Sequence, residues 1–92
     1  MKLRWTPASV RDLTRLRAFV GKDSQTAARV ADRLRVAAAM LRQQPLIGPA
    51  ATPVDFRTLI VGFGAGSYVL RYRVDPDAIV IMRIWHSREE RR

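Results

Sequence analysis

The chain contains no cysteine and only one histidine among its 92 residues. Without cysteine it forms neither a disulfide framework nor a thiolate metal site, and a single histidine is too few for a histidine-based metal centre. No run of apolar residues approaches the roughly 18 that a membrane-spanning helix needs, and the N-terminus lacks the apolar segment of a secretion signal. These absences predict a cytoplasmic protein with no metal or other cofactor and no association with a membrane.

Acidic residues are also scarce. The chain has 8 acidic and 17 basic residues, which gives it a net charge of +9. Such a charge attracts nucleic acid or an acidic protein partner and speeds the encounter with either. All the basic residues except Lys2 and Lys22 are arginines. Codon usage in a GC-rich genome would explain this bias, and so would a need for bidentate contacts to carboxylate or phosphate.

The length predicts a single domain spanning residues 1–92, in which the charged residues 88–92 form a flexible tail. Two helices are expected in its first half. Thr6 is a good N-cap and Pro7 suits the first helical position, and the apolar stripe of this helix is predicted to be Val10, Leu13, Leu16 and Val20.

The second helix is expected to begin near Ser24 and to end before Pro45. Its buried stripe is predicted to consist of apolar residues at helical spacing: Ala27, Val30, Ala31, Leu34, Ala37, Ala38 and Leu41. Because about four residues join the two helices, they must run antiparallel as a helical hairpin.

Strands are predicted at residues 3–5, 56–61, 67–74 and 78–85. The loops at 62–66 and 75–77 contain turn residues and have hairpin length, so the last three strands should pair antiparallel. The last strand is apolar on both faces, which suits a central position. The predicted fold class is α+β, in the order β-α-α-β-β-β, with the helical hairpin packed on one face of a mainly antiparallel twisted sheet.

The alternation of side chains in residues 67–74 predicts a basic sheet face. Tyr68, Tyr72 and their apolar neighbours share one face, whereas Arg71 and Arg73 share the other. Burying these arginines under a helix would be costly. They are therefore expected on the open face, toward water or an anion.

The layout and several short motifs together resemble the RelE/ParE toxin superfamily, over a stretch from Leu3 to about Arg88. The motifs that carry the resemblance are Trp5-Thr6-Pro7-Ala8, Asp12-Leu13, Leu41 with Pro45 and Gly48, Arg57 with Leu59, Tyr68 with Tyr72, and Ile84-Trp85-His86-Ser87-Arg88. The resemblance implies a cognate antitoxin with an acidic or amphipathic C-terminal segment. It also implies a cellular target: RelE-like members are ribosome-dependent mRNA endonucleases, and ParE-like members inhibit DNA gyrase.

The motif of the third strand favours the ParE-like branch. RelE-like nucleases resemble Arg-Leu-x-Tyr there, but this chain has Val69-Leu70-Arg71-Tyr72, and valine cannot stabilise an anion. RelE-like nucleases also carry a lysine or glutamate near the start of the second strand, or a tyrosine in the C-terminal segment. This chain has Asp55 near the first of these positions and no aromatic residue after Trp85. We therefore expect a toxin that inhibits gyrase and has no catalytic residues. One alternative is a ribosome-dependent mRNA endonuclease that uses His86, Arg57 and Arg88, and another is a non-toxic module that only binds the antitoxin.

The candidate residues for binding a partner or target are Arg57, Phe63, Arg71, Arg73, His86 and Arg88. Phe63 lies between two glycines and is expected to be an exposed loop anchor. His86 is expected to be a surface or strand-end histidine with one hydrogen bond, in preference to an acid or base. Arg57 belongs either to the site or to an ion pair, with Asp55 or with the antitoxin.

Overall fold

The computed structural model describes residues 1–20, 24–51, 56–64 and 66–89. Along the chain lie β1 (Lys2–Trp5), α1 (Pro7–Val20), α2 (Ser24–Met40), β2 (Ala50–Ala51), β3 (Phe56–Phe63), β4 (Gly66–Val74) and β5 (Ala78–His86). The predicted order of elements is confirmed, and the short strand β2 is an addition to it. None of the described helices has both the length and the apolar character needed to cross a bilayer.

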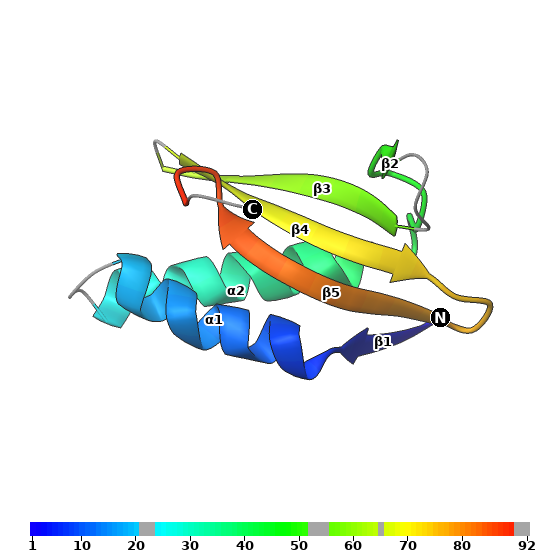
Figure 1. The fold of residues 1–92 in the computed structure, drawn as a ribbon, viewed down its shortest axis with the longest axis horizontal. Coiled ribbons are helices and arrows are strands. Elements are labelled where there is room, and N and C mark those ends of the chain that lie inside the picture. Colours follow the sequence, from blue (N-terminus) through cyan, green and yellow to red (C-terminus); the bar gives the residue numbers. More distant parts are fainter. Residues whose placement is uncertain (21–23, 52–55, 65, 90–92) are drawn as a thin grey trace.

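The strands form one five-stranded sheet in the order β1-β5-β4-β3-β2. Neighbouring strands pair antiparallel except β1, which runs parallel to β5. Strand β5 is therefore internal, as its apolar sequence predicts, and its residues from Ala78 to Ile81 are all buried. Figure 1 shows the two helices running together along the same side of this sheet.

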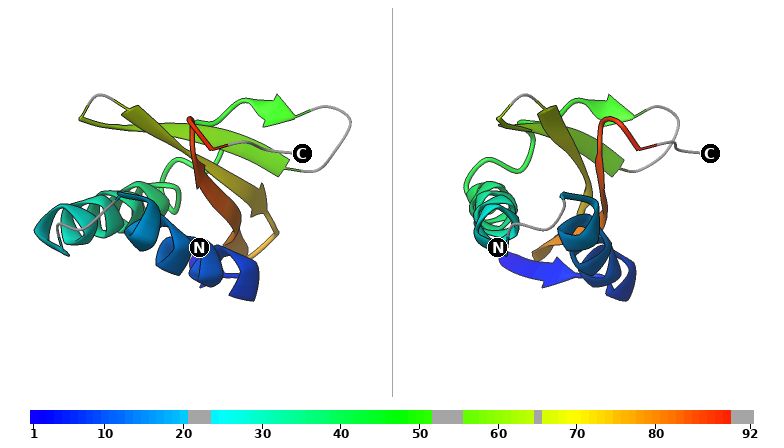
Figure 2. Two further views of the ribbon diagram at one scale, coloured as in Figure 1. Left: turned by 60° about the vertical axis from the view of Figure 1, so that its left-hand side comes forward. Right: turned by 90° about the vertical axis from the view of Figure 1, so that its left-hand side faces the viewer.

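The core lies between the helices and the side chains of β3, β4 and β5 that point toward them. Helix α2 contributes Val30, Leu34 and Ala38, and Leu41 adds to them directly after the helix ends; the sheet contributes Tyr68, Leu70, Tyr72, Ile79, Ile81 and Ile84. Most of the stripe predicted for the second helix is buried, and Figure 2 shows the sheet curling beside this helix. The stripe members Ala31 and Ala37 are half-buried. Burying these apolar side chains provides the main driving force for folding.

Helix α1 differs from its prediction at Val10, which is 50% exposed, whereas Asp12 is 2% exposed. The reason is that α1 continues past the end of β1 and covers the edge of β5 that β1 leaves unpaired. Thr6 Oγ1 donates to the carbonyl of Met82 at 2.9 Å, and the Ile84 amide donates to Asp12 at 2.8 Å. A strand edge needs hydrogen-bonding groups, which a valine cannot supply. The Val20 side chain lies outside the described residues.

The loop after α2 is fixed by a buried hydroxyl. Tyr72 donates its hydroxyl to the Pro45 carbonyl at 2.8 Å and accepts the Gly48 amide at 3.0 Å. At Gly48 an added Cβ would lie 2.5 Å from the carbonyl oxygen of Thr58, so only glycine fits there. This loop therefore lies close against one end of the sheet.

The first hairpin loop is shorter than predicted. Strand β3 extends to Phe63 and β4 begins at Gly66, with Gly64 at a φ of 60°. The expectation that Phe63 is an exposed loop residue is wrong: it is half-buried and packs against the core. Alternation along β3 explains the error, because Phe63 falls on the same face as Leu59 and Val61.

The predicted tail is also shorter than expected, because Glu89 is bound. Its carboxylate accepts two hydrogen bonds from Arg15, both at 2.9 Å, and one from the His86 amide at 2.8 Å. The fixed structure therefore extends to Glu89. Residues 90–92, the rest of the predicted tail, lie outside the described residues.

Candidate functional site

The face of the sheet opposite the helices, which we call the far face, carries a row of arginines. It consists of the side chains of β3, β4 and β5 that point away from the core: Phe56, Thr58, Ile60, Val69, Arg71, Arg73, Arg83 and Trp85. The predicted placement of Arg71 and Arg73 on this face is confirmed. On β4 they alternate with Tyr72, which is fully buried on the helix side.

Arg71 does not extend freely into water, contrary to the expectation. Its guanidinium lies 4.3 Å from the centre of the Phe56 ring and 5.0 Å from that of Trp85. Two aromatic rings stabilise the cation through their negative faces. Arg71 is therefore half-buried in an aromatic stack with Phe56 and Trp85 on the far face.

Arg73 is held by a carboxylate on the next turn. Its Nε and Nη2 donate to the two oxygens of Asp75 at 2.7 and 3.0 Å. The hydrogen bond from Arg73 lowers the pKa of Asp75 below its ordinary value, and the same contact raises the pKa of Arg73. Asp75 therefore fixes this guanidinium in addition to its place in the turn between β4 and β5.

Arg57 points to the helix side of the sheet, where it reaches the loop after α2. Its Nη1 donates to the carbonyl oxygen of Gly48 at 2.8 Å and approaches that of Leu46 at 3.5 Å. Within the described ranges no carboxylate pairs with Arg57. The predicted partner Asp55 lies outside those ranges.

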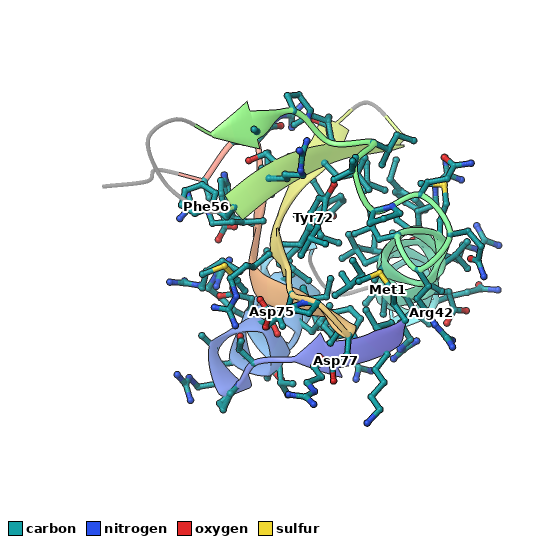
Figure 3. The ribbon with its side chains drawn as sticks, turned by 90° about the vertical axis from the view of Figure 1, so that its right-hand side faces the viewer. Met1, Arg42, Phe56, Tyr72, Asp75 and Asp77 are labelled. Carbon is teal, nitrogen blue, oxygen red and sulfur yellow. The ribbon has the colours of Figure 1, made fainter. Side chains whose placement is uncertain are left out.

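Arg57, from the helix side, and Arg73, from the far face, both line an open groove of about 460 Å³ at the Asp75 end of the sheet. Figure 3 looks at this end, with Phe56 and Tyr72 on opposite sides of the ribbon. We call it the Asp75 groove, and its lining residues are Leu46, Ala50, Phe56, Arg57, Arg73, Val74 and Asp75. The structure thus brings together two of the six candidate residues in one concave site.

His86 lies at the other end of the sheet. It pairs with Tyr68 on β4, whereas Arg57 pairs with Tyr72, four residues further along, which corresponds to about 13 Å of strand. Arg88 is next to His86 and is exposed. The three residues of the nuclease alternative are therefore not gathered at one site.

The His86 side chain is only 7% exposed, so the expected strand-end position is right and the expected surface position is wrong. Its Nδ1 accepts the Arg88 amide at 3.0 Å, and its ring meets that of Tyr68 edge-on at 4.9 Å. A Cβ added at Gly66 would lie 2.5 Å from its Nε2. The imidazole therefore packs inside the hairpin end of the sheet.

A buried polar cluster that was not predicted from the sequence joins α1 to β5. Asp12 accepts hydrogen bonds from Arg83 at 2.8 and 3.1 Å, and it also bonds Arg15, which in turn holds Glu89. Burial acts to raise the pKa of Asp12, but the hydrogen bonds from Arg83, the Ile84 amide and Arg15 outweigh it, so the pKa lies below its ordinary value. The hydrogen bond with Glu89 raises the pKa of Arg15 in turn.

One signal for this cluster was present in the sequence. Asp12 lies four residues before Leu16, so the two share a helix face. An acidic residue in an apolar stripe indicates a buried partner. In the described part of the chain, no group of three or more potential metal-ligating side chains occurs.

This chain is similar to known proteins in both sequence and fold. The family model of the ParE toxin of the type II toxin–antitoxin system parDE matches residues 3–91. The chain is similar to toxin RelE3 of Caulobacter vibrioides, with 44% identity over 86 residues that cover 92% of each chain. Toxin RelE2 of the same organism is 39% identical over 84 residues, covering 90% of this chain and 91% of that toxin.

Solved structures show the same fold. The chromosomal ParDE system of P. aeruginosa contains a chain with a TM-score of 0.78 and 23% identity, covering 94% of this chain and 95% of that one. The RelBE2 toxin–antitoxin complex of Mycobacterium tuberculosis contains one with a TM-score of 0.57 and 26% identity, covering 92% and 95%. Since the family model spans almost the whole sequence, the chain belongs to the ParE toxin family, within the ParE/RelE superfamily of type II toxin–antitoxin toxins.

Proposed function

We propose that this toxin arrests growth by inhibiting DNA gyrase, without cutting RNA, and that a cognate antitoxin neutralises it. The observation that carries the proposal is the position of His86. Its imidazole is buried on the helix side of the sheet and bonded to the Arg88 amide, away from the arginines of the far face.

RNA cleavage of the RelE type needs a base for the 2′-hydroxyl and an acid for the leaving oxygen. On the far face, the described ionisable side chains of the strands are Arg71, Arg73 and Arg83. Arginine stays protonated at neutral pH and cannot serve as a base. Two of them are also paired with carboxylates, Arg73 with Asp75 and Arg83 with Asp12. These residues therefore do not support proton transfer.

The antitoxin partner is supported by a second surface. A groove of about 260 Å³ runs between α2 and β3, and its apolar lining includes Val36 at 68% exposure and Met40 at 37%. In the described residues, β2 pairs with Arg57 and Phe56, and the Pro49 carbonyl accepts the Thr58 amide at 3.2 Å, so the edge of β3 has no partner strand in the described part of the chain beyond Thr58. An amphipathic segment of an antitoxin fits such an edge and groove, and an acidic one complements the net charge of +9.

Purified toxin added to DNA gyrase and relaxed plasmid should reduce supercoiling, and adding the antitoxin first should restore it. A His86→Gln variant that remains folded should inhibit gyrase as the wild type does. The proposal fails if supercoiling is unaffected while messages on translating ribosomes are cut. Loss of that cutting in His86→Gln would then assign the nuclease role to His86.

A further inference from the structure

We propose that the Asp75 groove is a carboxylate-binding site that takes an acidic side chain, with an adjacent apolar one, from a protein partner. The choice of a protein as occupant rests on the proposed antitoxin. The site itself does not depend on gyrase inhibition, because its geometry comes from residues of this chain alone.

Arg57 provides a positive charge in the groove that no carboxylate of the described ranges balances. Among the described residues, only its Nη1 is bonded, to two loop carbonyls. Its Nε and Nη2 groups donate to no other residue of the described ranges, so we assign them as donors for a ligand. The Gly48 carbonyl that orients Arg57 belongs to the loop that Tyr72 fixes, so the guanidinium is held in place before a ligand arrives.

Arg73 lies in the same groove, with its charge balanced by Asp75 at 2.7 Å. Among the described lining residues, the two arginines and one aspartate leave one positive charge, which matches one carboxylate. A ligand carboxylate would bind Arg57 directly and would be repelled by Asp75. Removing the charge of Asp75 should therefore strengthen binding, whereas removing that of Arg57 should weaken it.

The walls of the groove favour a protein over a nucleic acid. Leu46 is 64% exposed, and with Phe56 and Val74 it forms an apolar surface beside the two guanidinium groups. An amino-acid side chain next to the acidic one could bury against this wall. A nucleic-acid backbone carries repeated phosphates, which would meet Asp75 and this apolar surface instead of further cations.

The test is an NMR titration of the full chain labelled with ¹⁵N, following the Nε–Hε signals of Arg57 and Arg73. The probe is the peptide acetyl-Leu-Glu-Leu-amide, compared with acetyl-Leu-Gln-Leu-amide and with decathymidylate. We expect saturable shifts with the glutamate peptide and none with the glutamine peptide. Arg57→Met should weaken binding about tenfold, and Asp75→Asn should strengthen it about threefold.

The matched control is Arg35→Met, since Arg35 is an exposed helix arginine that pairs only with Asp32 among the described residues; its binding should equal that of the wild type. If Arg57→Met is not folded, Leu46→Ser removes the exposed wall instead and should weaken binding about threefold. The inference is overturned if the glutamine peptide binds equally well, if Arg57→Met and Leu46→Ser both bind as the wild type, or if only decathymidylate shifts these signals. Gyrase inhibition by the same variants is measured separately, so that failure of either proposal is recognised on its own.

Discussion

Replacing Asp12 with alanine should destabilise the fold far more than the loss of a surface ion pair does. The Asp12 carboxylate is almost fully buried and accepts the Ile84 amide at 2.8 Å. Without it, that buried amide has no acceptor at the edge of β5, where α1 replaces a neighbouring strand. Arg83 and Arg15 would lose the same partner.

The size of the effect follows from these contacts. A buried amide left without its hydrogen bond costs about 1–3 kcal/mol. The side chains of Arg83 and Arg15 are each 38% exposed, so water replaces much of what they lose, and each adds only about 0.5 kcal/mol. We expect Asp12→Ala to lower the free energy of unfolding by about 2–4 kcal/mol, and Asp12→Asn, which keeps an acceptor oxygen, by about half as much.

Urea unfolding followed by circular dichroism measures this directly. With a slope of about 1.5 kcal/mol per molar urea, the midpoint of Asp12→Ala should fall by roughly 2 M. The matched control is Asp32→Ala on α2, where Asp32 is 75% exposed and its partner Arg35 is 60% exposed; it should change stability by less than about 0.5 kcal/mol. Equal small losses in Asp12→Ala and Asp32→Ala would refute the reasoning, because the buried carboxylate would then contribute no more than a surface ion pair.

Three further predictions concern the same framework. Hydrogen bonds hold the pKa of Asp12 in the folded state below the ordinary value of 3.8. Its contribution to the free energy of unfolding is therefore complete above that pH and is lost as the pH falls through the lower folded value. In urea unfolding between about pH 2.5 and 6, the free energy of unfolding of Asp12→Asn should fall less steeply with decreasing pH than that of the wild type. Gly48→Ala places a Cβ 2.5 Å from the carbonyl oxygen of Thr58 and should lower the free energy of unfolding by about 1–3 kcal/mol. Gly62→Ala, where no atom lies within 4 Å of the added Cβ, should lower it far less. Similar melting temperatures for the two variants would contradict the packing described. Tyr72→Phe removes the hydroxyl that fixes the loop and should cost about 1–2 kcal/mol in calorimetry, and an unchanged melting temperature would show that the loop is held by other contacts.

Much of the fold could be predicted from local patterns. The stripe of α2, the alternation of β4 and the apolar run of β5 each depend on a residue's place in a repeat, and each prediction is confirmed apart from the half-buried Ala31 and Ala37. Hairpin loops also fixed the antiparallel pairing of the last strands. The parallel pairing of β1 with β5 joins residues 2–5 to 78–81, and no local pattern specifies a contact at that separation.

The candidate site was predicted less completely, for a related reason. The sequence placed Arg71 and Arg73 on the open face, but it did not show that Arg71 stacks between Phe56 and Trp85 or that Arg73 pairs with Asp75. An arginine's surroundings depend on which strands become its neighbours. The isolated sequence therefore indicates where a charge lies and leaves its partners open.

By itself, the amino-acid sequence determined the order of the elements, the two faces of the central strands and the excess of positive charge. Only the tertiary structure decided that His86 is buried, that Asp12 closes the edge of β5, and that Arg57 and Arg73 share one groove. The physical reason is that periodicity and charge are properties of neighbours along the chain. Burial and hydrogen-bond partners are set by residues that are distant in sequence and meet only in the folded state.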